Sequence, residues 1–424
     1  MSGLNSLNEW MITAAMSTVI TLITGCSGAS IDTQSNPPAV TAPSTSVPAA
    51  GTGGSAGSTT SQPKQGSQQQ AGAVNTAIPY TQEVVASKLN VPWDMDIAPD
   101  GRIFFTERGG VIRVIDKGKL VEQPVYRFEK PFLQEGESGL LGLVLDKDFA
   151  TNHAMYVYHT YEEGGETRNQ VLRMVEGSNQ LQLDKVIIDK LPGARTHDGG
   201  RVKIGPDGML YITSGDAGQS SIAQDLSQLG GKILRIGPDG TIPRDNPFPD
   251  SPVYSLGHRN PQGLAWHAVT GKLFSTEHGQ SAHDEFNLIE PGANYGWPLI
   301  EGDESEIAAK DKSKLGPGTL KSPLVHSGNE TWAPSGITFV TKGPWKGNLL
   351  AANLRGTQLL RVVLGNDQQS IQQLEPLLKN VLGRIRNVME GPDGSIYIMT
   401  NNRDGRGTPG AEDDQIIRLK PNFQ

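Results

Sequence analysis

The sequence predicts an all-β protein with a six-bladed β-propeller fold, because of its composition, an internal repeat and the length of that repeat. The 424 residues include 51 glycines and 28 prolines, which is too many for long helices and is typical of a turn-rich β protein. A unit of two strands joined by a Pro-Asp-Gly turn recurs between residues 77 and 424. Six such units in this range have roughly 55 to 60 residues each, slightly more than the repeats of compact propellers.

The repeated unit is a β-hairpin. Three clear copies occupy residues 95–106, 202–213 and 388–399, and each has Pro-Asp-Gly between two apolar segments. Proline sets the turn, glycine accepts a positive φ, and the flanking residues alternate as half-buried strands do. Looser copies begin at Gly139, Gln262 and Ser335. We therefore expect one propeller blade from each unit.

Two other architectures fit the sequence less well. A pair of β-sandwiches predicts a break in composition between two halves of the domain, and no such break is visible. A helical fold conflicts with the glycines and Pro-Asp-Gly turns that interrupt every candidate helix.

The N-terminal segment ends in the only cysteine of the chain. An apolar run from Trp10 to Gly25 precedes Cys26, and Ile23-Thr24-Gly25 before that cysteine resembles a bacterial lipobox. The run is shorter than the ~20 residues of a spanning helix but fits a signal peptide. We predict a signal peptide over residues 1–25 and lipidation of Cys26. The alternative is a hydrophobic N-terminus on a cytosolic protein, since residues 1–25 contain no Lys or Arg.

Residues 26–76 have the composition of a flexible tether. After Cys26 this segment is mostly Ser, Gly, Thr, Ala, Pro and Gln, with Asp32 and Lys64 as its only charges and no aromatic residue. Such a sequence does not bury enough apolar surface to offset its chain entropy. We therefore expect the folded domain at 77–424, in the periplasm or at the cell surface, held to a membrane by the N-terminal lipid alone.

Charge and cysteine content exclude several function classes. The 37 Lys and Arg residues against 45 Asp and Glu residues give a net charge of −8, without a basic block, so nucleic acid is not expected as a partner. The single cysteine allows no intramolecular disulfide and no cysteine-based metal cluster. A metal in this protein therefore needs oxygen or imidazole ligands.

Polar residues gather in several loops of the predicted propeller. Loops of successive blades meet near the axis, so residues far apart in sequence share one site. The polar clusters are at residues 196–201, 215–218, 257–263, 277–285 and 384–386. Phosphate-binding loops and His-Glu-x-x-His motifs are absent from the sequence, and no glycine fingerprint leads from a predicted strand into a helix. The Gly-x-Ser-x-Gly spacing at 53–57 lies in the low-complexity segment and not at the end of a strand, so it is no nucleophile elbow.

Three of these segments carry a specific resemblance. Gly-His-Arg-Asn-Pro-Gln-Gly-Leu at 257–264, Asp-Glu-Phe-Asn-Leu-Ile at 284–289 and Asn-Tyr-Gly-Trp-Pro at 294–298 are similar to the soluble glucose dehydrogenases and aldose sugar dehydrogenases that depend on pyrroloquinoline quinone (PQQ). The similarity covers essentially all of the domain after the tether. It implies oxidation of aldoses at the C1 hydroxyl to the lactone, with PQQ and calcium as cofactors. An external acceptor, which is a quinone, a cytochrome or a dye, would take the electrons.

The resemblance also implies a catalytic base. His197 matches the catalytic histidine of the family, and a neutral imidazole titrates near neutral pH, which suits removal of a hydroxyl proton. Asp216 is expected to orient His197 or to bind the sugar. The alternative for His197 is a histidine that only satisfies backbone groups of its loop.

A set of guanidinium groups fits the chemistry of the implied cofactor. PQQ carries three carboxylates, which arginine binds through forked hydrogen bonds. The resemblance places Arg259 and Asn260 on PQQ, with Arg384 and Arg386 as further partners. Arg355 aligns where the glucose dehydrogenases have a lysine, so the charge is kept and the pairing geometry changes.

Two calcium sites are implied in the same way. Backbone carbonyls of Gly279 and Gln280 match the ligands of the calcium that the quinone oxygens chelate, although proline is common at the second position. Glu285 and the backbone of Tyr295 resemble a second, structural calcium site. The alternative for Glu285 is an ordinary surface carboxylate.

Two residues are candidates for sugar contacts. Glu137 occupies a position that the family uses near the substrate, and a carboxylate there in place of the amide of the glucose enzyme would change which hydroxyls are accepted. Trp332 is a candidate aromatic platform in the pocket, or else a tryptophan of a blade core.

Two other functions remain to be weighed. A propeller lactonase would hold a metal on the axis among several Asp and Glu ligands, and this reading leaves the arginine set unexplained. A propeller that only binds ligands has no need for His197 together with Arg259, Asn260, Arg384 and Arg386. The sequence therefore favours the dehydrogenase.

Overall fold

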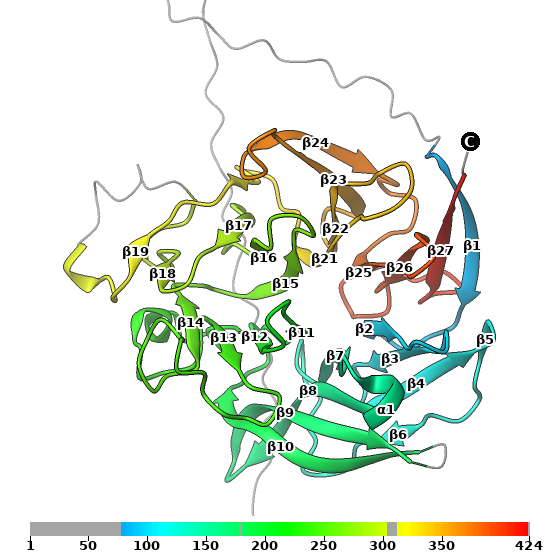
Figure 1. The fold of residues 1–424 in the computed structure, drawn as a ribbon, viewed down its shortest axis with the longest axis horizontal. Coiled ribbons are helices and arrows are strands. Elements are labelled where there is room, and N and C mark those ends of the chain that lie inside the picture. Colours follow the sequence, from blue (N-terminus) through cyan, green and yellow to red (C-terminus); the bar gives the residue numbers. More distant parts are fainter. Residues whose placement is uncertain (1–77, 178–179, 303–311, 423–424) are drawn as a thin grey trace, which may run out of the picture. The chain divides into compact units, whose positions relative to one another are not determined.

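The structure is a computed structural model that describes residues 78–177, 180–302 and 312–422. Their strands form six sheets arranged around a common axis (Figure 1), so the predicted all-β propeller with six blades is confirmed. The predicted signal peptide (1–25), Cys26 and the tether to residue 76 lie outside the described residues. Within the described part, no helix is both long enough and apolar enough to cross a membrane.

Each blade is an antiparallel sheet whose first strand lies nearest the axis. The first blade contains β2 (Pro92–Ile97), β3 (Ile103–Glu107), β4 (Val111–Asp116), β5 (Lys119–Leu120) and β6 (Tyr126–Arg127). The second contains β7 (Leu140–Leu145), β8 (Ala154–Glu163), β9 (Glu166–Glu176) and β10 (Leu181–Pro192), with α1 (Phe149–Asn152) in its first turn. The third contains β11 (Val202–Ile204), β12 (Leu210–Ser214), β13 (Lys232–Ile236) and β14 (Val253–Leu256), with the short 3-10 helix Ser220–Gln224 before β13.

The remaining three blades follow the same plan. The fourth contains β15 (Pro261–Trp266), β16 (Leu273–Glu277), β17 (Glu285–Ile289) and β20 (Val325–His326). The fifth contains β21 (Pro334–Phe339), β22 (Leu349–Asn353), β23 (Gln358–Leu364) and β24 (Ile371–Leu377). The sixth contains β25 (Ile385–Glu390), β26 (Ile396–Thr400), β27 (Ile416–Pro421) and β1 (Tyr80–Ala86). A long insertion after β17 extends the third blade, where β18 (Ala293–Asn294) pairs in parallel with β14 and with β19 (Thr319–Leu320).

The two ends of the described chain close the ring. β1 pairs antiparallel with β27, from Tyr80 opposite Pro421 to Ala86 opposite Ile416. This pairing covers the edge of the last blade with the first strand of the chain, and it leaves no gap between the first and the sixth blade (Figure 1).

The Pro-Asp-Gly turns of the three clear copies adopt the predicted geometry. Gly101, Gly208 and Gly394 have φ values of 89°, 78° and 81°, which residues with a Cβ rarely adopt. Each glycine amide donates to the carbonyl three residues earlier, and these bonds close the turns. The motif therefore marks the hairpin between the first and second strands of the first, third and sixth blades.

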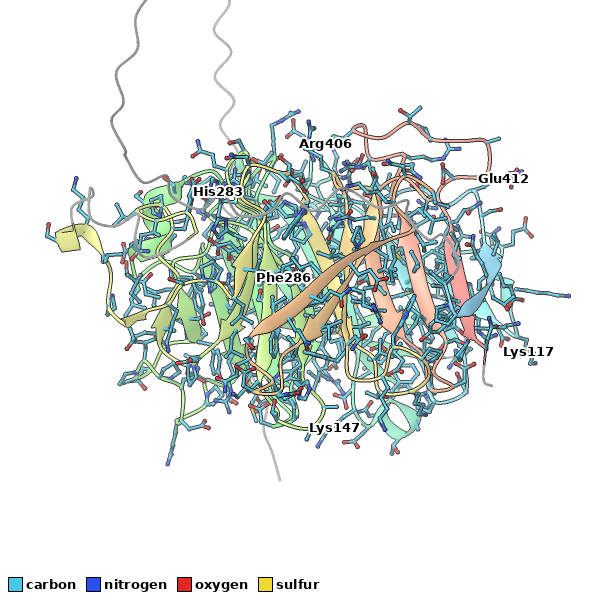
Figure 2. All side chains as sticks on the ribbon, turned by 90° about the horizontal axis from the view of Figure 1, so that it is seen from above. Lys117, Lys147, His283, Phe286, Arg406 and Glu412 are labelled. Carbon is cyan, nitrogen blue, oxygen red and sulfur yellow. The ribbon has the colours of Figure 1, made fainter. Side chains whose placement is uncertain are left out.

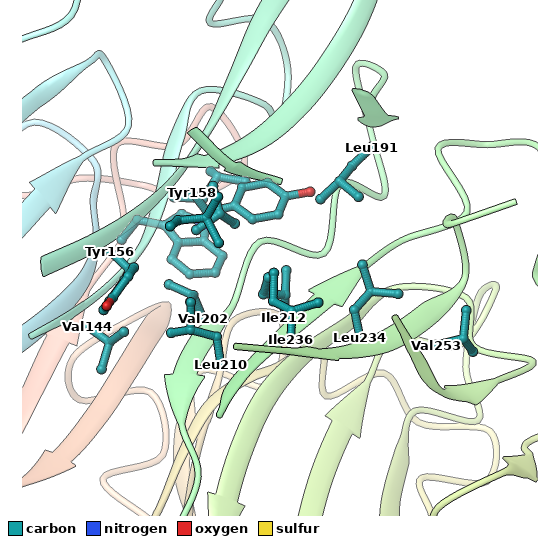
Figure 3. Packing of buried hydrophobic residues seen from close by; sticks show 14 of the residues in the cluster. Val144, Tyr156, Tyr158, Leu191, Val202, Leu210, Ile212, Leu234, Ile236 and Val253 are labelled. Carbon is teal, nitrogen blue, oxygen red and sulfur yellow. The ribbon is translucent and has the colours of Figure 1, made fainter. Parts of the chain in front are cut away.

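The apolar core lies between neighbouring blades. Figure 3 shows one such layer, in which Tyr156 and Tyr158 of β8 face Leu210 and Ile212 of β12. These four side chains are 0–1% exposed. Burial of one large apolar side chain contributes about 1.5–3 kcal/mol, so layers of this kind between the blades hold the ring together.

Polar side chains fill the axis. Asp94 and Arg201 are almost completely buried, and Arg201 Nη1 lies 2.7 Å from Asp94 Oδ1. Asp94 also accepts hydrogen bonds from Asn387 Nδ2 (2.7 Å) and the amide of Leu143 (3.1 Å). Arg201 Nε donates to the carbonyl of Gln262 at 2.8 Å. These contacts connect the inner regions of five blades beneath one face of the ring.

The loops that carry the predicted site residues share this face. They are the segments before the inner strands and the connections between the second and third strands of the third, fourth and fifth blades. Figure 2 shows Arg406 and His283 at this face and Lys147 at the opposite one. The fold thus brings the polar clusters of the sequence to one side of the propeller.

Candidate active site

A cavity of about 330 Å³ opens on the loop face. Eight of the predicted site residues line it: Glu137, His197, Arg259, Gly279, Gln280, Arg355, Arg384 and Arg386. They come from five different blades, so the propeller fold is what brings them together.

His197 is paired with a buried carboxylate. Its Nδ1 lies 2.7 Å from Oδ1 of Asp216, and the side chains are 19% and 2% exposed, respectively. Asp216 also accepts from the indole Nε1 of Trp297 at 2.8 Å and from the amide of Gly218 at 2.8 Å. Burial alone would raise the pKa of Asp216, but these hydrogen bonds and His197 lower it overall. An ionised Asp216 accepts a hydrogen bond from Nδ1–H of His197, which leaves the lone pair on Nε2 available for a proton from a substrate.

The backbone of His197 is held in an unusual conformation. Its φ is 62°, in the left-handed region that residues with a Cβ rarely occupy. Its amide donates to Oε2 of Glu137 at 3.1 Å, and its carbonyl accepts from the amide of Ala217 at 3.1 Å. The carbonyl packs so closely on Gly215 that a Cβ there would lie 1.9 Å from it. The position of the imidazole is therefore fixed by its backbone as well as by Asp216.

Positive charge dominates the cavity. Five guanidinium groups line it (Arg259, Arg355, Arg384, Arg386 and Arg406), against two carboxylates (Glu137 and Asp284). Asp284 is occupied by backbone donors, since it accepts from the amides of Gly279, Trp332 and Ala333. The unbalanced charge favours a ligand with several negative groups.

Arg384 and Arg386 are directed by neighbouring polar side chains. Arg384 donates from Nε and Nη2 to Oδ2 of Asp404 at 3.0 and 2.6 Å. Arg386 donates from Nη1 to Oε1 of Gln262 at 2.8 Å. Burial lowers the pKa of Arg386 to about 9, which measures the cost of placing this cation away from water. An anionic ligand in the cavity would offset that cost.

Arg259 and Asn260 keep unused donors beside the cavity. Arg259 Nε is buried without a partner, and its Nη1 donates to the carbonyl of His278 at a long 3.3 Å. Burial lowers the pKa of Arg259 as well. Asn260 does not line the cavity; its Oδ1 accepts from the amide of Gly199 at 3.0 Å, and its Nδ2 is buried without a partner. Unsatisfied donors of this kind indicate a missing acceptor.

Gly279 and Gln280 lie at the wall of the same cavity. A Cβ at residue 279 would come within 1.9 Å of the carbonyl of Ala282, so this tight loop requires glycine. The amide of Gly279 donates to Asp284 Oδ1 at 3.0 Å, which fixes the loop. Among the described residues no group of three or more His, Cys, Asp or Glu side chains has the arrangement of a metal site. A cation next to the guanidinium groups would therefore depend on carbonyl oxygens such as those of these two residues.

Glu285 is buried, so the alternative of an ordinary surface carboxylate is wrong. It accepts from Asn287 Nδ2 and from the amide of Gly302, both at 3.0 Å. Burial and the nearby carboxyl of Glu277, opposite it across β16 and β17, raise the pKa of Glu285 well above its usual value. Two buried carboxyl groups this close together are a setting that a divalent cation stabilises.

Tyr295 lies in the same neighbourhood. His258 Nδ1 lies 2.7 Å from Glu277 Oε2, and the ring of Tyr295 stacks on His258 with centroids 4.7 Å apart. The predicted pair of Glu285 and Tyr295 is thus brought to one buried region, linked through Glu277 and His258.

Trp332 does not line the cavity, although its neighbours Thr331 and Ala333 do. Its ring packs edge-on against Phe286, with centroids 6.1 Å apart, next to an apolar cluster of the fourth and fifth blades. Trp332 is thus a partly buried side chain at the edge of this apolar cluster.

Three lining residues had no role assigned from the sequence. His278 faces the cavity with a buried, unpartnered Nε2, and burial lowers its pKa to about 4, so this imidazole stays neutral. Because His278 directly precedes the predicted site residue Gly279, its position in the sequence could have predicted that it lines the cavity. Gln262 holds Arg386 and belongs to the 257–264 motif. Arg406 lies in a long loop without any motif, and only the fold shows that it reaches the cavity.

Comparisons with known proteins support the resemblance. Residues 89–417 match the family described as Glucose / Sorbosone dehydrogenase. The chain is 32% identical over 305 residues to Quinoprotein glucose dehydrogenase B of Acinetobacter calcoaceticus, which covers 63% of this chain and 62% of that protein. It is 31% identical over 342 residues to Aldose sugar dehydrogenase YliI of Escherichia coli K12, which covers 76% of this chain and 90% of that protein. The solved PQQ-bound aldose sugar dehydrogenase of Streptomyces coelicolor superposes with a TM-score of 0.71 at 35% identity, over 82% of this chain and 99% of that one.

Proposed function

Since this chain belongs to the glucose/sorbosone dehydrogenase family and is a PQQ-dependent sugar dehydrogenase, we propose that it oxidises the C1 hydroxyl of aldoses to the lactone. The observation that carries this proposal is that His197, paired with Asp216, shares one cavity with five guanidinium groups. A proton acceptor and a binding site for a polyanion thus lie side by side, as the reaction requires.

His197 is the base in this proposal. Nδ1–H of His197 donates a hydrogen bond to Asp216, so Nε2 of the same ring accepts the proton of the C1 hydroxyl. The carboxylate of Asp216 also stabilises the imidazolium that forms, and the indole of Trp297 keeps that carboxylate in place. Glu137 would accept hydrogen bonds from sugar hydroxyls at the same wall of the cavity.

PQQ would be held by the arginines. Arg259, Arg384 and Arg386 would grip its carboxylates or quinone oxygens, with the exposed Arg355 as a further partner, and the unpartnered Nδ2 of Asn260 would be an additional donor. When bound, PQQ accepts the hydride from C1 and passes the electrons to an external acceptor such as a quinone, a cytochrome or a dye. The burial of Arg259 and Arg386 strengthens their attraction for an anion, because little water competes there.

Calcium would be bound at two places. Carbonyl oxygens of Gly279 and Gln280 would hold one ion beside the quinone, where it supplies Lewis-acid polarisation. Glu285 and the carbonyl of Tyr295 would hold a second ion that neutralises buried carboxyl groups and stabilises the insertion after β17.

The two other functions have less support. A propeller lactonase needs several free carboxylates on the axis, but the axial Asp94 is paired with Arg201, and the described residues include no group of three or more His, Cys, Asp or Glu side chains arranged as a metal site. A binding module without catalysis gives no reason for a buried carboxylate behind a strained histidine.

We further propose that the enzyme is anchored in the periplasm or at the cell surface through a lipid on Cys26, after removal of residues 1–25. Metabolic labelling with radioactive palmitate is expected to label the full-length protein and not Cys26→Ala. Equal labelling of the two proteins would exclude this anchor.

Titration of the cofactor-free protein tests the proposed reaction. We expect saturable binding of PQQ with calcium present, followed by reduction of a dye that depends on added aldose, with lactone as the product. Saturable PQQ binding without oxidation of any aldose would refute the C1 reaction, and the absence of PQQ binding would refute the cofactor site.

A further inference from the structure

A chain of contacts joins the sixth blade to the backbone of His197. Arg406, half exposed in the connection between β26 and β27, places Nη1 2.9 Å from Oε1 of Glu137. The other oxygen of that carboxylate, Oε2, accepts the amide of His197 at 3.1 Å. Both oxygens of Glu137 are therefore occupied, one by a side chain and one by the backbone of the catalytic residue.

The hydrogen bond to His197 supports a strained conformation. A residue other than glycine in the left-handed region costs of order 1 kcal/mol and persists only where its surroundings hold it. Glu137 holds this loop twice, since its own amide also donates to the carbonyl of Arg195 at 2.8 Å. Of these two contacts, the one through Oε2 of Glu137 is made to the amide of His197, the residue whose φ is positive.

The loop that carries Arg406 is itself well fixed. The amide of Arg406 donates to Asp404 Oδ1 at 2.8 Å, and Asp404 Oδ2 holds Arg384. Asp414 closes the base of the loop through the amide of Asn402. The connection between β26 and β27 thus orients two guanidinium groups. Its Asp404 holds Arg384 at the cavity, and its own Arg406 contacts Glu137.

We propose that Arg406 is a positioning residue, which holds Glu137 so that its carboxylate fixes the backbone of His197 in the conformation needed for proton abstraction. This inference rests on the proposed function of His197. It assigns Glu137 a backbone-holding role in addition to sugar contact, and it makes the base depend on a loop of the last blade.

Amide hydrogen exchange of the cofactor-free full-length protein tests the contact without relying on activity. We expect Arg406→Ala to speed exchange at the amide of His197 several-fold, and Arg406→Lys to restore part of the protection. Arg195→Ala is the matched control. The exposed ion pair of Arg195 and Glu135 joins the loop of His197 to the loop of Glu137, and neither residue lines the cavity. Unchanged exchange in Arg406→Ala, or an equal change in Arg195→Ala, would overturn the proposal.

Steady-state kinetics provides the second test. Loss of positioning lowers kcat more than it raises KM, and we expect Arg406→Ala to lower kcat about 3- to 10-fold, given that half-exposed ion pairs are weak and that small misplacements of a catalytic group are costly. Arg195→Ala is expected to keep wild-type kcat. A rise in KM with unchanged kcat would instead identify Arg406 as a substrate contact and refute the positioning role.

A double-mutant cycle separates the pathway through Glu137 from an independent effect of Arg406. Glu137→Gln keeps an acceptor for the His197 amide but loses the ion pair, so we expect it to resemble Arg406→Ala. The double variant Arg406→Ala/Glu137→Gln is expected to be no worse than either single variant. If the loss of kcat in the double variant equals the product of the losses in the two single variants, Arg406 does not act through Glu137. Inactivity of wild-type enzyme on every aldose would refute the proposed reaction and leave the exchange result standing.

Discussion

Nδ1 of His197 lies 2.7 Å from Oδ1 of Asp216, and of these two side chains only the imidazole reaches the cavity. The buried carboxylate and the partly exposed base therefore have separate tasks. In the proposed reaction Asp216 fixes the tautomer, and His197 exchanges the proton with the substrate.

Replacement of His197 should separate chemistry from cofactor binding. We expect His197→Gln to lower turnover by about two to four orders of magnitude, the usual effect of losing a positioned general base. PQQ affinity should change little, since the guanidinium groups do not depend on this side chain. Stopped-flow reduction by sugar and fluorescence titration with PQQ measure the two quantities. Normal turnover in His197→Gln would mean that this histidine only shapes its loop, and Asp216 would then be the next candidate for the base.

Arg259→Ala should show the opposite pattern. It removes a buried guanidinium that has an unused Nε donor, so we expect PQQ to bind at least tenfold more weakly, because charge-assisted bonds contribute about 1.5–3 kcal/mol. Turnover should partly recover as the PQQ concentration is raised. Arg244→Ala is a suitable control, since Arg244 does not line the cavity. If raising PQQ restores no activity to Arg259→Ala, then Arg259 acts in catalysis rather than in binding.

Calcium removal should stop turnover and spare most of the fold. The propeller is held by strand pairing and by apolar layers between the blades, neither of which involves Gly279 or Gln280. We expect a chelator to abolish sugar oxidation while the far-ultraviolet circular dichroism keeps most of its β signal, and added calcium to restore activity. Sugar oxidation that continues at the same rate after chelation would rule out the Lewis-acid role.

Much of the fold was predictable because its signals are local. Pro-Asp-Gly favours a tight turn, and Gly101, Gly208 and Gly394 do adopt the positive φ that it implies in the hairpins of three blades. The parallel pairing of β18 with β14 was not predictable, since it depends on how a long insertion folds back over the third blade. No local pattern encodes such a contact.

The site was predictable where it lies in motifs and not where a side chain reaches it from a distance. His197, Arg259 and Arg386 stand in recognisable segments and line one cavity. Arg406 belongs to a loop without a pattern, and its contact with Glu137 spans blades far apart in sequence. Trp332 shows the converse, because its two chain neighbours line the cavity while its own ring packs against Phe286 at the edge of an apolar cluster.

Asp198 should make stability depend on pH. Burial raises its pKa to about 7, and its Oδ2 has no partner, while Oδ1 accepts from Asn169 and the amide of Ala194. The unfolded chain has an Asp pKa of about 3.9, so folding favours the protonated form. This contribution is complete below pH 3.9 and is lost as the pH rises through about 7.

The corresponding measurement is thermal unfolding between pH 5 and pH 8.5. We expect the melting temperature of the wild-type protein to fall over this range more steeply than that of Asp198→Asn, which cannot ionise. Asp189→Asn, on the exposed part of β10, serves as the control and should follow the wild-type curve. Parallel curves for wild type and Asp198→Asn would show that Asp198 does not titrate in this range.

The axial pair of Asp94 and Arg201 should be a large determinant of stability. Removing one partner of a buried ion pair leaves the other charge without compensation, which typically costs about 3–5 kcal/mol. We expect Arg201→Met to lower the free energy of unfolding by about this amount, reduced by Lys203, whose Nζ lies 3.6 Å from Asp94 Oδ1. Chemical denaturation monitored by tryptophan fluorescence measures it.

A second variant distinguishes the ion pair from a simple loss of packing. Asp94→Asn removes the charge that Arg201→Met leaves unpaired, so the double variant Asp94→Asn/Arg201→Met should be less destabilised than the sum of the single variants. The exposed pair of Arg195 and Glu135 is the control, and Arg195→Ala should cost less than about 1 kcal/mol. Additive losses at Asp94 and Arg201 would mean that packing of the arginine between the inner strands, rather than its charge, stabilises the axis.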